Sequence, residues 1–143
     1  KKSALDPQKG LNVVLEPELK KLAIANPKHA PYGRAAEESL RYYGLWDKVQ
    51  DKLVFGENIS QTAQFVQTGA ADAGIIAMSL AISPSMSESG SYWVIPTESY
   101  SRLEQVYTVL QRGKGKPSVK TFLEFVQGKK GGKILSDFGF ILP

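Results

Sequence analysis

The chain has 143 residues, of which 42% are hydrophobic and 22% charged, so it is long enough for a hydrophobic core and too apolar to be disordered. Its formal net charge of +4 comes from lysines spread along the sequence, which favours a solvated basic surface. Attraction of anions or nucleic acid is the alternative, although no basic motif with interleaved aromatic residues supports nucleic acid. Zero cysteines exclude disulfides and thiolate metal sites, and a single histidine argues against a clustered zinc site.

The N-terminal region shows no basic segment followed by an apolar one, the pattern typical of a leader. Residues 1–10 are a polar lead-in, and the apolar run at 11–15 is expected to form a strand or a packed turn. No apolar run in the chain approaches the roughly 18 residues of a transmembrane helix. We therefore expect no membrane span, in a protein that is either soluble and intracellular or shown without its leader.

Two strand-loop-helix units follow. In the first, a short apolar strand at 21–26 ends at a proline, and helical spacing of apolar residues runs from Gly33 to a stop at Gly44. In the second, a strand at 53–55 turns into another helix, after which a third strand is expected at 73–78. Short turns between such units are typical of an α/β fold with a parallel sheet.

Beyond residue 80 the predicted elements are less regular. We expect a serine-rich loop at 82–90, a strand at 91–96 and an extended segment at 103–111. A turn at 112–118 and two helical pieces at 118–128 and 129–140 follow. Pro96 would end the strand, and Pro117 suits the first position of a helix.

Catalysis has no good candidate in the sequence. His29 has neither a serine-carboxylate pattern nor a metal partner at helical spacing, and the glycines form neither a Walker A loop nor a dinucleotide fingerprint. No sequence spacing indicates that any two of four carboxylates act as a catalytic pair, so we expect them at surface or capping positions. They are Glu57, Asp72, Glu104 and Asp137. We therefore predict that the chain is not an enzyme and carries no cofactor and no metal.

Oxyanion binding has better support, at the two loops that lead from a strand into a helix. A helix N-terminus presents unpaired N–H groups and the positive end of the helix dipole, and open α/β sheets bind ligands at the carboxyl ends of their strands. In the first loop, prolines restrict the backbone and Gly33 leaves room for close approach. In the second, the donors would be the amides of Ile59 and Ser60, with Asn58 or Ser60 as the N-cap and Gln61 in a capping box. The alternative is a pair of well-capped helices without a ligand.

Three stretches of the sequence together resemble the periplasmic molybdate- and tungstate-binding proteins of ABC transporters. They are ANPKHAPYG at 25–33, GENISQTAQFVQTGAADAGIIA at 56–77 and FLEFVQGKKGGKILSDFGFILP at 122–143. The resemblance implies a type II periplasmic binding protein, in which two three-layer α/β lobes with parallel-rich sheets close on a tetrahedral oxyanion held by neutral donors. It also implies an ABC-transporter permease as partner and a periplasmic or extracellular location.

The resemblance places the family's two backbone donors at the amides of Tyr32 and Ile59. The argument from helix termini selects the same positions. Supporting residues around them are Pro31, Gly33, Asn58 and Ser60. Some relatives add a tyrosine hydroxyl from a strand of the second lobe, where this chain has Ala77, so that contact is not expected here.

The resemblance further implies that a first-lobe segment with two serine or threonine sites for the anion is missing. On this mapping residues 1–99 form the second, ligand-binding lobe, and residues 100–143 form the crossover segment and the C-terminal part of a partial first lobe. We expect a truncated clamp that binds molybdate or tungstate far more weakly than a complete protein and associates with itself through the incomplete lobe. The alternatives are a related fold for sulfate or another oxyanion, and a ligand-free scaffold or interaction fragment.

Overall fold

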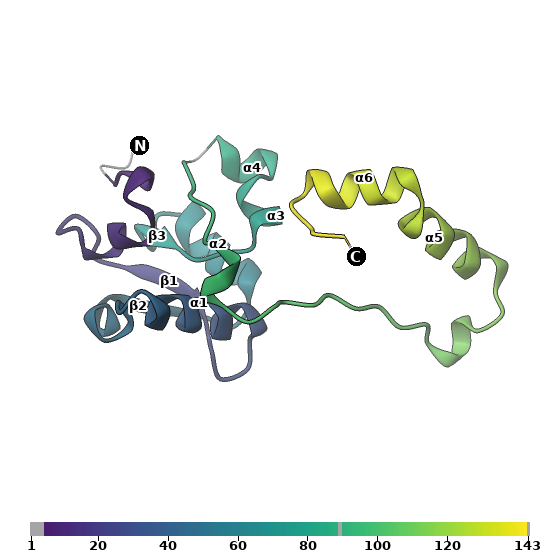
Figure 1. Ribbon diagram of the computed structural model, residues 1–143, viewed down its shortest axis with the longest axis horizontal. Coiled ribbons are helices and arrows are strands. Elements are labelled where there is room, and N and C mark those ends of the chain that lie inside the picture. Colours follow the sequence, from purple (N-terminus) through teal and green to yellow (C-terminus); the bar gives the residue numbers. More distant parts are fainter. Residues whose placement is uncertain (1–4, 89, 143) are drawn as a thin grey trace. The chain divides into compact units, whose positions relative to one another are not determined.

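The computed structural model describes residues 5–88 and 90–142, which divide into two compact units (Figure 1). The first unit extends to Leu103, and the second begins at Glu104. The first contains the parallel sheet and its helices, and the second contains a pair of successive helices. The predicted assignment of the two parts to the lobes of a clamp, with a boundary at 99/100, stays a prediction.

The sheet of the first unit has three parallel strands in the order β2-β1-β3. They are β1 (Leu22–Ala25), β2 (Leu53–Gly56) and β3 (Ala73–Gly74), which confirms the three predicted strands. The central strand is buried at every residue, as its continuous apolar run requires in a parallel sheet covered on both faces. The third strand is shorter than the predicted 73–78, because the chain leaves the sheet after the Ile75 amide donates to the Ala23 carbonyl (2.9 Å).

Helices cover both faces of this sheet. Leu22 and Ile24 of β1 pack with Ala36 and Leu40 of α1 (Pro31–Tyr42) in the main hydrophobic core. Side chains alternate along a strand, so Ala23 points to the other face. There α2 (Ile59–Gln67) packs, with its Val66 against Gly74 of β3. The first unit is therefore a three-layer α/β arrangement, as the sequence predicts.

The start of α1 is displaced from the prediction. The helix begins at Pro31 and not at Gly33, because proline has a helical φ already fixed and lacks only an N–H that the first turn does not use. Its end agrees with the prediction, since Gly44 has a φ of 65° and follows the C-cap.

The N-terminal apolar run forms a packed turn and not a strand. It belongs to η1 (Pro7–Leu15), which consists of two 3-10 turns on either side of a kink at Gly10 (φ 60°, ψ −144°). This segment buries Leu11 and Val14 and thus takes in part of the predicted polar lead-in. The amino group of Lys52 donates to the carbonyls of Val14 (2.9 Å) and Glu16 (3.4 Å) at the end of η1. Residues 1–4 of the lead-in lie outside the described residues. Two further 3-10 helices precede β2: η2 (Trp46–Lys48) and η3 (Gln50–Lys52).

The segment after β3 corrects three predictions. The short helix α3 (Met78–Ala81) replaces the end of the predicted third strand, and α4 (Pro84–Ser87) lies within the predicted serine-rich loop, of which Ser89 lies outside the described residues. The predicted strand at 91–96 is also wrong, since these residues run without a ladder partner to the 3-10 helix η4 (Thr97–Ser99). Strand propensity alone does not form a strand where no neighbouring strand offers hydrogen bonds.

Contacts with α1 hold the segment that follows η4 in the first unit. The hydroxyls of Ser39 and Ser99 lie 3.1 Å apart in the interior, and the Ser99 hydroxyl donates to the carbonyl of Pro96 (2.7 Å). The Ser101 amide donates to a carboxylate oxygen of Glu38 (2.6 Å). These bonds attach the chain to the polar side of α1 until it leaves the unit at Leu103.

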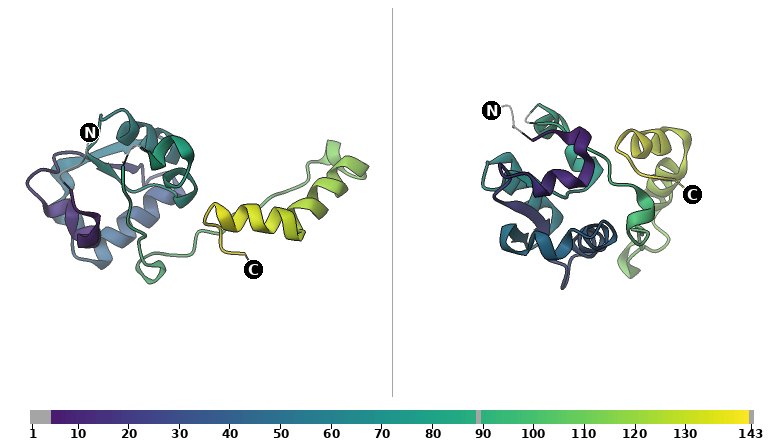
Figure 2. Two further views of the ribbon diagram at one scale, coloured as in Figure 1. Left: turned by 90° about the horizontal axis from the view of Figure 1, so that it is seen from above. Right: turned by 60° about the vertical axis from the view of Figure 1, so that its left-hand side comes forward.

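The second unit begins with the predicted extended segment and continues into two helices. The 3-10 helix η5 (Gln111–Gly113) lies in the predicted turn, and α5 (Pro117–Gln127) has Pro117 in its first turn, as predicted. The next helix, α6 (Lys129–Asp137), follows directly, and Figure 2 shows the two helices meeting at a bend. Gly131 permits this packing, because a Cβ there would overlap the backbone of Phe125 and Val126.

Gly33 is required for packing between α1 and β1. A Cβ at this position would overlap the carbonyl group of Ala25 and the carbonyl carbon of Asn26. The space that the missing side chain of Gly33 leaves is therefore filled by the end of the central strand. Helix α1 can begin directly above that strand only with glycine here.

We predict that Gly33→Ala destabilises the first unit by about 1–3 kcal/mol, the usual cost of overpacking. Urea unfolding followed by tryptophan fluorescence measures this, since both tryptophans, Trp46 and Trp93, lie in the first unit. Gly90→Ala is the control, because a Cβ there meets no atom within 4 Å. Equal unfolding midpoints for the two variants would contradict the packing role of Gly33.

Candidate functional site

The two predicted donor loops lie side by side at one edge of the sheet. Strands β1 and β2 are parallel neighbours, and Ala25 pairs with Gly56 at their carboxyl ends. The Asn26 amide donates to the Gly56 carbonyl (2.8 Å), which extends the pairing into the loops. The N-termini of α1 and α2 are thereby delivered to the same edge, where open α/β sheets bind ligands.

The first turn of α1 leaves one amide without an acceptor. Ala30 is the N-cap, and its carbonyl accepts from the amides of Gly33 (3.0 Å) and Arg34 (3.1 Å). Pro31 has no N–H to donate. Among the residues that the structure describes, the Tyr32 amide has no hydrogen-bond acceptor. It is therefore the open donor of this helix end, at the position that the sequence predicts.

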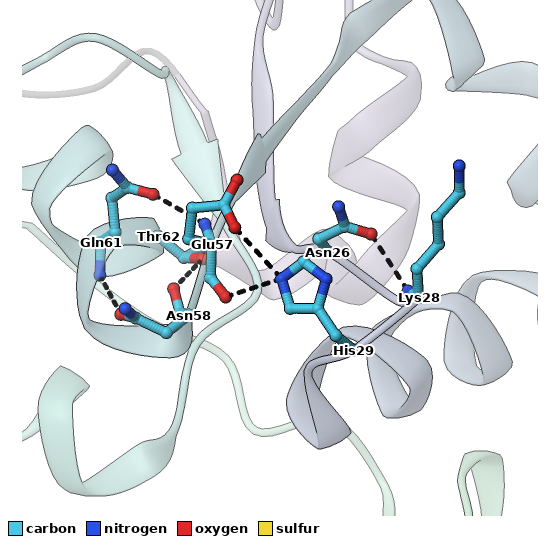
Figure 3. A network of polar contacts seen from close by, with 7 residues as sticks. All are labelled: Asn26, Lys28, His29, Glu57, Asn58, Gln61 and Thr62. Carbon is cyan, nitrogen blue, oxygen red and sulfur yellow. Dashed lines mark hydrogen bonds and ion pairs between the residues drawn. The ribbon is translucent and has the colours of Figure 1, made fainter.

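The first turn of α2 is capped by a side chain. The structure selects Asn58 over Ser60 as the N-cap, and its Oδ1 accepts from the Gln61 amide (2.9 Å; Figure 3). Gln61 Oε1 accepts in turn from the Glu57 amide (2.7 Å), one residue before the position that a standard capping box uses. Within the described part of the chain, the amides of Ile59 and Ser60 have no acceptor. The predicted donors of the second loop are thus open.

A contact between the loops involves two residues to which the sequence assigned no shared role. His29 Nε2 lies 3.1 Å from the Glu57 carbonyl oxygen and 3.3 Å from Glu57 Oε2 (Figure 3). The two residues are 28 positions apart, so no motif spacing could reveal the contact. The sequence could indicate this contact only through the predicted fold, because each residue follows one of two strands that pair in parallel.

The side chain of Tyr32 places no charge beside the open amides. Burial raises the pKa of the Tyr32 phenol above its ordinary value, and the nearby Tyr100 adds to this effect. The phenol is therefore uncharged at neutral pH and does not repel an anion. Figure 3 shows the amino group of Lys28 pointing away from Asn58. The site is consequently made of backbone dipoles more than of side-chain charges.

The described residues contain no group of three or more histidine, aspartate or glutamate side chains arranged to hold a metal ion. No helix within the described ranges has the length and apolar character needed to cross a bilayer.

The sequence profile of the family described as bacterial extracellular solute-binding protein matches residues 1–141 of this chain. A molybdate-binding protein of Azotobacter vinelandii is 36% identical over 121 residues, which cover 85% of this chain and 48% of that protein. The chain therefore spans about half the length of the curated relatives that it matches.

Solved structures give the same result. The chain resembles the periplasmic molybdate-binding protein of Azotobacter vinelandii with a TM-score of 0.85 and 29% identity, over 100% of this chain and 62% of that one. It resembles the substrate-binding domain of a putative molybdenum ABC transporter from Clostridium difficile with a TM-score of 0.64 and 27% identity, over 91% of this chain and 56% of that one. The α/β fold with a parallel sheet is thus common to all three.

We predict that Asn58→Ala destabilises the first unit by about 1 kcal/mol, because it removes the oxygen that caps α2. Ser60→Ala is the matched control at the same helix end and is expected to change stability by less than about 0.5 kcal/mol, since Ser60 is exposed. Urea unfolding followed by tryptophan fluorescence compares the two. A larger loss of stability for Ser60→Ala than for Asn58→Ala would show that Ser60, and not Asn58, caps α2.

Proposed function

This chain belongs to the family of bacterial extracellular solute-binding proteins, and we propose that it binds a tetrahedral oxyanion, molybdate or tungstate, for an ABC importer. The observation that carries the proposal is that α1 and α2 begin next to each other, each with an open amide in its first turn. The ligand-binding residues are the amides of Tyr32 and Ile59. Pro31, Gly33 and Asn58 support them by fixing the two helix ends, and Ser60 by its own open amide.

The strength of this site follows from the number of donors. Two charge-assisted hydrogen bonds contribute about 3–6 kcal/mol net. Association costs about 4–15 kcal/mol in translational and rotational freedom. Because the gain barely reaches the cost, we expect this chain by itself to bind molybdate with a Kd of about 1 mM or weaker. Donors from a second lobe, which the resemblance implies for complete clamps, would add to the gain without a second association cost.

The proposed site selects its ligand by the charge and the shape of the anion. Backbone N–H groups recognise a doubly charged tetrahedral anion through its oxygens, so they do not distinguish molybdenum from tungsten. Sulfate presents the same oxygens in a smaller tetrahedron and is the competing ligand. The permease of an ABC transporter is the proposed partner, in the periplasm or outside the cell. The family description and the transporter named for the Clostridium difficile domain support this assignment.

We predict that Ile59→Pro weakens molybdate binding by at least about tenfold, the value of one charge-assisted hydrogen bond. The substitution removes the amide without altering charge. Ile59 is the first residue of α2, where proline is tolerated, and Asn58 before it is already extended, with φ −151° and ψ 174°. Amide chemical shifts followed by NMR during titration with sodium molybdate measure the effect.

Ile59→Val is the control, because it shortens the side chain and keeps the amide. Parallel titrations with tungstate, sulfate and phosphate define the ligand class. Full affinity in Ile59→Pro would contradict the donor role, and a preference for phosphate would contradict the ligand. A flat response to all four anions, together with a tight stoichiometric complex with another protein, would favour the scaffold alternative.

Self-association is a further part of the proposal, and the second unit supports it. Apolar side chains are exposed along the extended segment and on α5, including Val106 (91% exposed) and Phe122 (63%). Phe122 borders a hollow of about 440 Å³ between residues 107–113 and α5. In the described structure the backbone groups of residues 105–109 make no backbone hydrogen bonds. An apolar edge of this kind favours pairing with a second copy of the chain.

We predict that Val106→Glu shifts the chain from dimer to monomer, because it places a charge in the proposed contact. Sedimentation velocity over a concentration series measures the change. Tyr42→Glu is the control, since Tyr42 is also exposed (61%) but lies in the first unit. A chain that is monomeric at all concentrations, or a dimer that both substitutions leave intact, would contradict self-association through the second unit.

A further inference from the structure

We propose that His29 is a positioning residue of the oxyanion site, which fixes the two donor loops relative to each other and donates a hydrogen bond to the carboxylate of Glu57 beside them. The inference rests on the proposed function, because it assigns a role within that site. It concerns a contact between two loops that the sequence separates by 28 positions.

The geometry identifies which atom carries the proton. His29 Nε2 faces both the carbonyl oxygen of Glu57 (3.1 Å) and its Oε2 (3.3 Å; Figure 3). A carbonyl oxygen only accepts hydrogen bonds, so Nε2 must be protonated to make this contact. One N–H group therefore contacts the main chain and the side chain of the residue that precedes the N-cap of α2.

This contact adds a second point of attachment between the loops. At the strand ends, the Asn26 amide donates to the Gly56 carbonyl (2.8 Å). The remaining bonds here lie within one loop each: Lys28 amide to Asn26 Oδ1 (3.0 Å), and Glu57 amide to Gln61 Oε1 (2.7 Å). Two attachments restrain the angle between the loops more than one does. We therefore assign to His29 part of the restraint on the separation of the Tyr32 and Ile59 amides.

The same contact answers an electrostatic problem. Glu57 lies two residues before Ile59, and a carboxylate at a helix N-terminus stabilises the helix but repels an oxyanion bound there. The imidazole N–H on Oε2 counters that charge. The side chains of His29 and Glu57 are 49% and 76% exposed, so their pairing contributes little to overall stability and variants at both positions are expected to fold.

Three variants separate the two parts of the role. His29→Leu removes the donor, His29→Gln keeps an N–H donor near the position of Nε2, and Glu57→Gln removes the charge but keeps the backbone carbonyl. Each ¹⁵N-labelled chain is titrated with sodium molybdate, and the amide signals of Tyr32, Glu57, Ile59 and Ser60 are followed by NMR. Thermal unfolding confirms that each variant is folded.

We expect His29→Leu to shift the amide signals of Glu57, Ile59 and Ser60 in the absence of ligand and to weaken molybdate binding roughly three- to tenfold, the value of one net hydrogen bond. His29→Gln should restore both. Glu57→Gln should strengthen binding, because repulsion is removed while the carbonyl contact remains.

The ligand-free signals make the outcome independent of the proposed function. Unchanged signals at Glu57, Ile59 and Ser60 in His29→Leu would overturn the contact between the loops, whether or not molybdate binds. Changed signals with no molybdate binding in the unsubstituted chain would instead contradict the proposed function and reduce His29 to a structural contact. Weaker binding in Glu57→Gln would overturn the inference that the Glu57 carboxylate repels the bound anion.

Discussion

The arrangement of the candidate site depends on the parallel pairing of β1 with β2. Parallel strands end at the same edge of a sheet, and the register that pairs Ala25 with Gly56 makes both chains leave the sheet at the same level. A slip of one residue would turn the side chains of β2 to the opposite face and bring Phe55 beside Ala25. The two loops would then no longer begin side by side. Every later feature of the site, from the helix starts to the contact of His29 with Glu57, follows from this register.

Two glycines allow the helices to begin close to the paired strand ends. Gly33 allows α1 to start against the carbonyl end of β1, and at Gly56 a Cβ would lie only 2.6 Å from the Thr62 hydroxyl of α2. Both helices therefore approach the strand ends more closely than any other residue would permit. Each helix N-terminus has one fewer unpaired N–H group, for a different reason. Pro31 has no N–H in α1, and the side chain of Asn58 accepts from one N–H in α2. What remains open is the amide of Tyr32 in α1 and the amides of Ile59 and Ser60 in α2.

The sequence predicts those parts of this structure that depend on local chemistry. The apolar run of β1, the stop at Gly44, the cap at Asn58 and the proline start of α5 are each determined within a few residues, and each is found in the structure. The strand expected at 91–96 fails because a strand needs a partner that no local pattern specifies. The contact between His29 and Glu57 could not be predicted for the same reason, since it exists only once the two strands are paired.

The chemistry of the two helix ends explains why a contact between loops matters more here than in a site built from charged side chains. A lysine or arginine reaches its anion through flexible bonds and tolerates small movements of the backbone, whereas a backbone N–H points in a direction that its helix fixes. The proposed recognition of an oxyanion by Tyr32 and Ile59 therefore requires that two helices hold the correct mutual orientation. The accuracy of the proposed oxyanion site therefore depends on how its two loops are held together, and the contact of His29 with Glu57 links them beyond the strand ends.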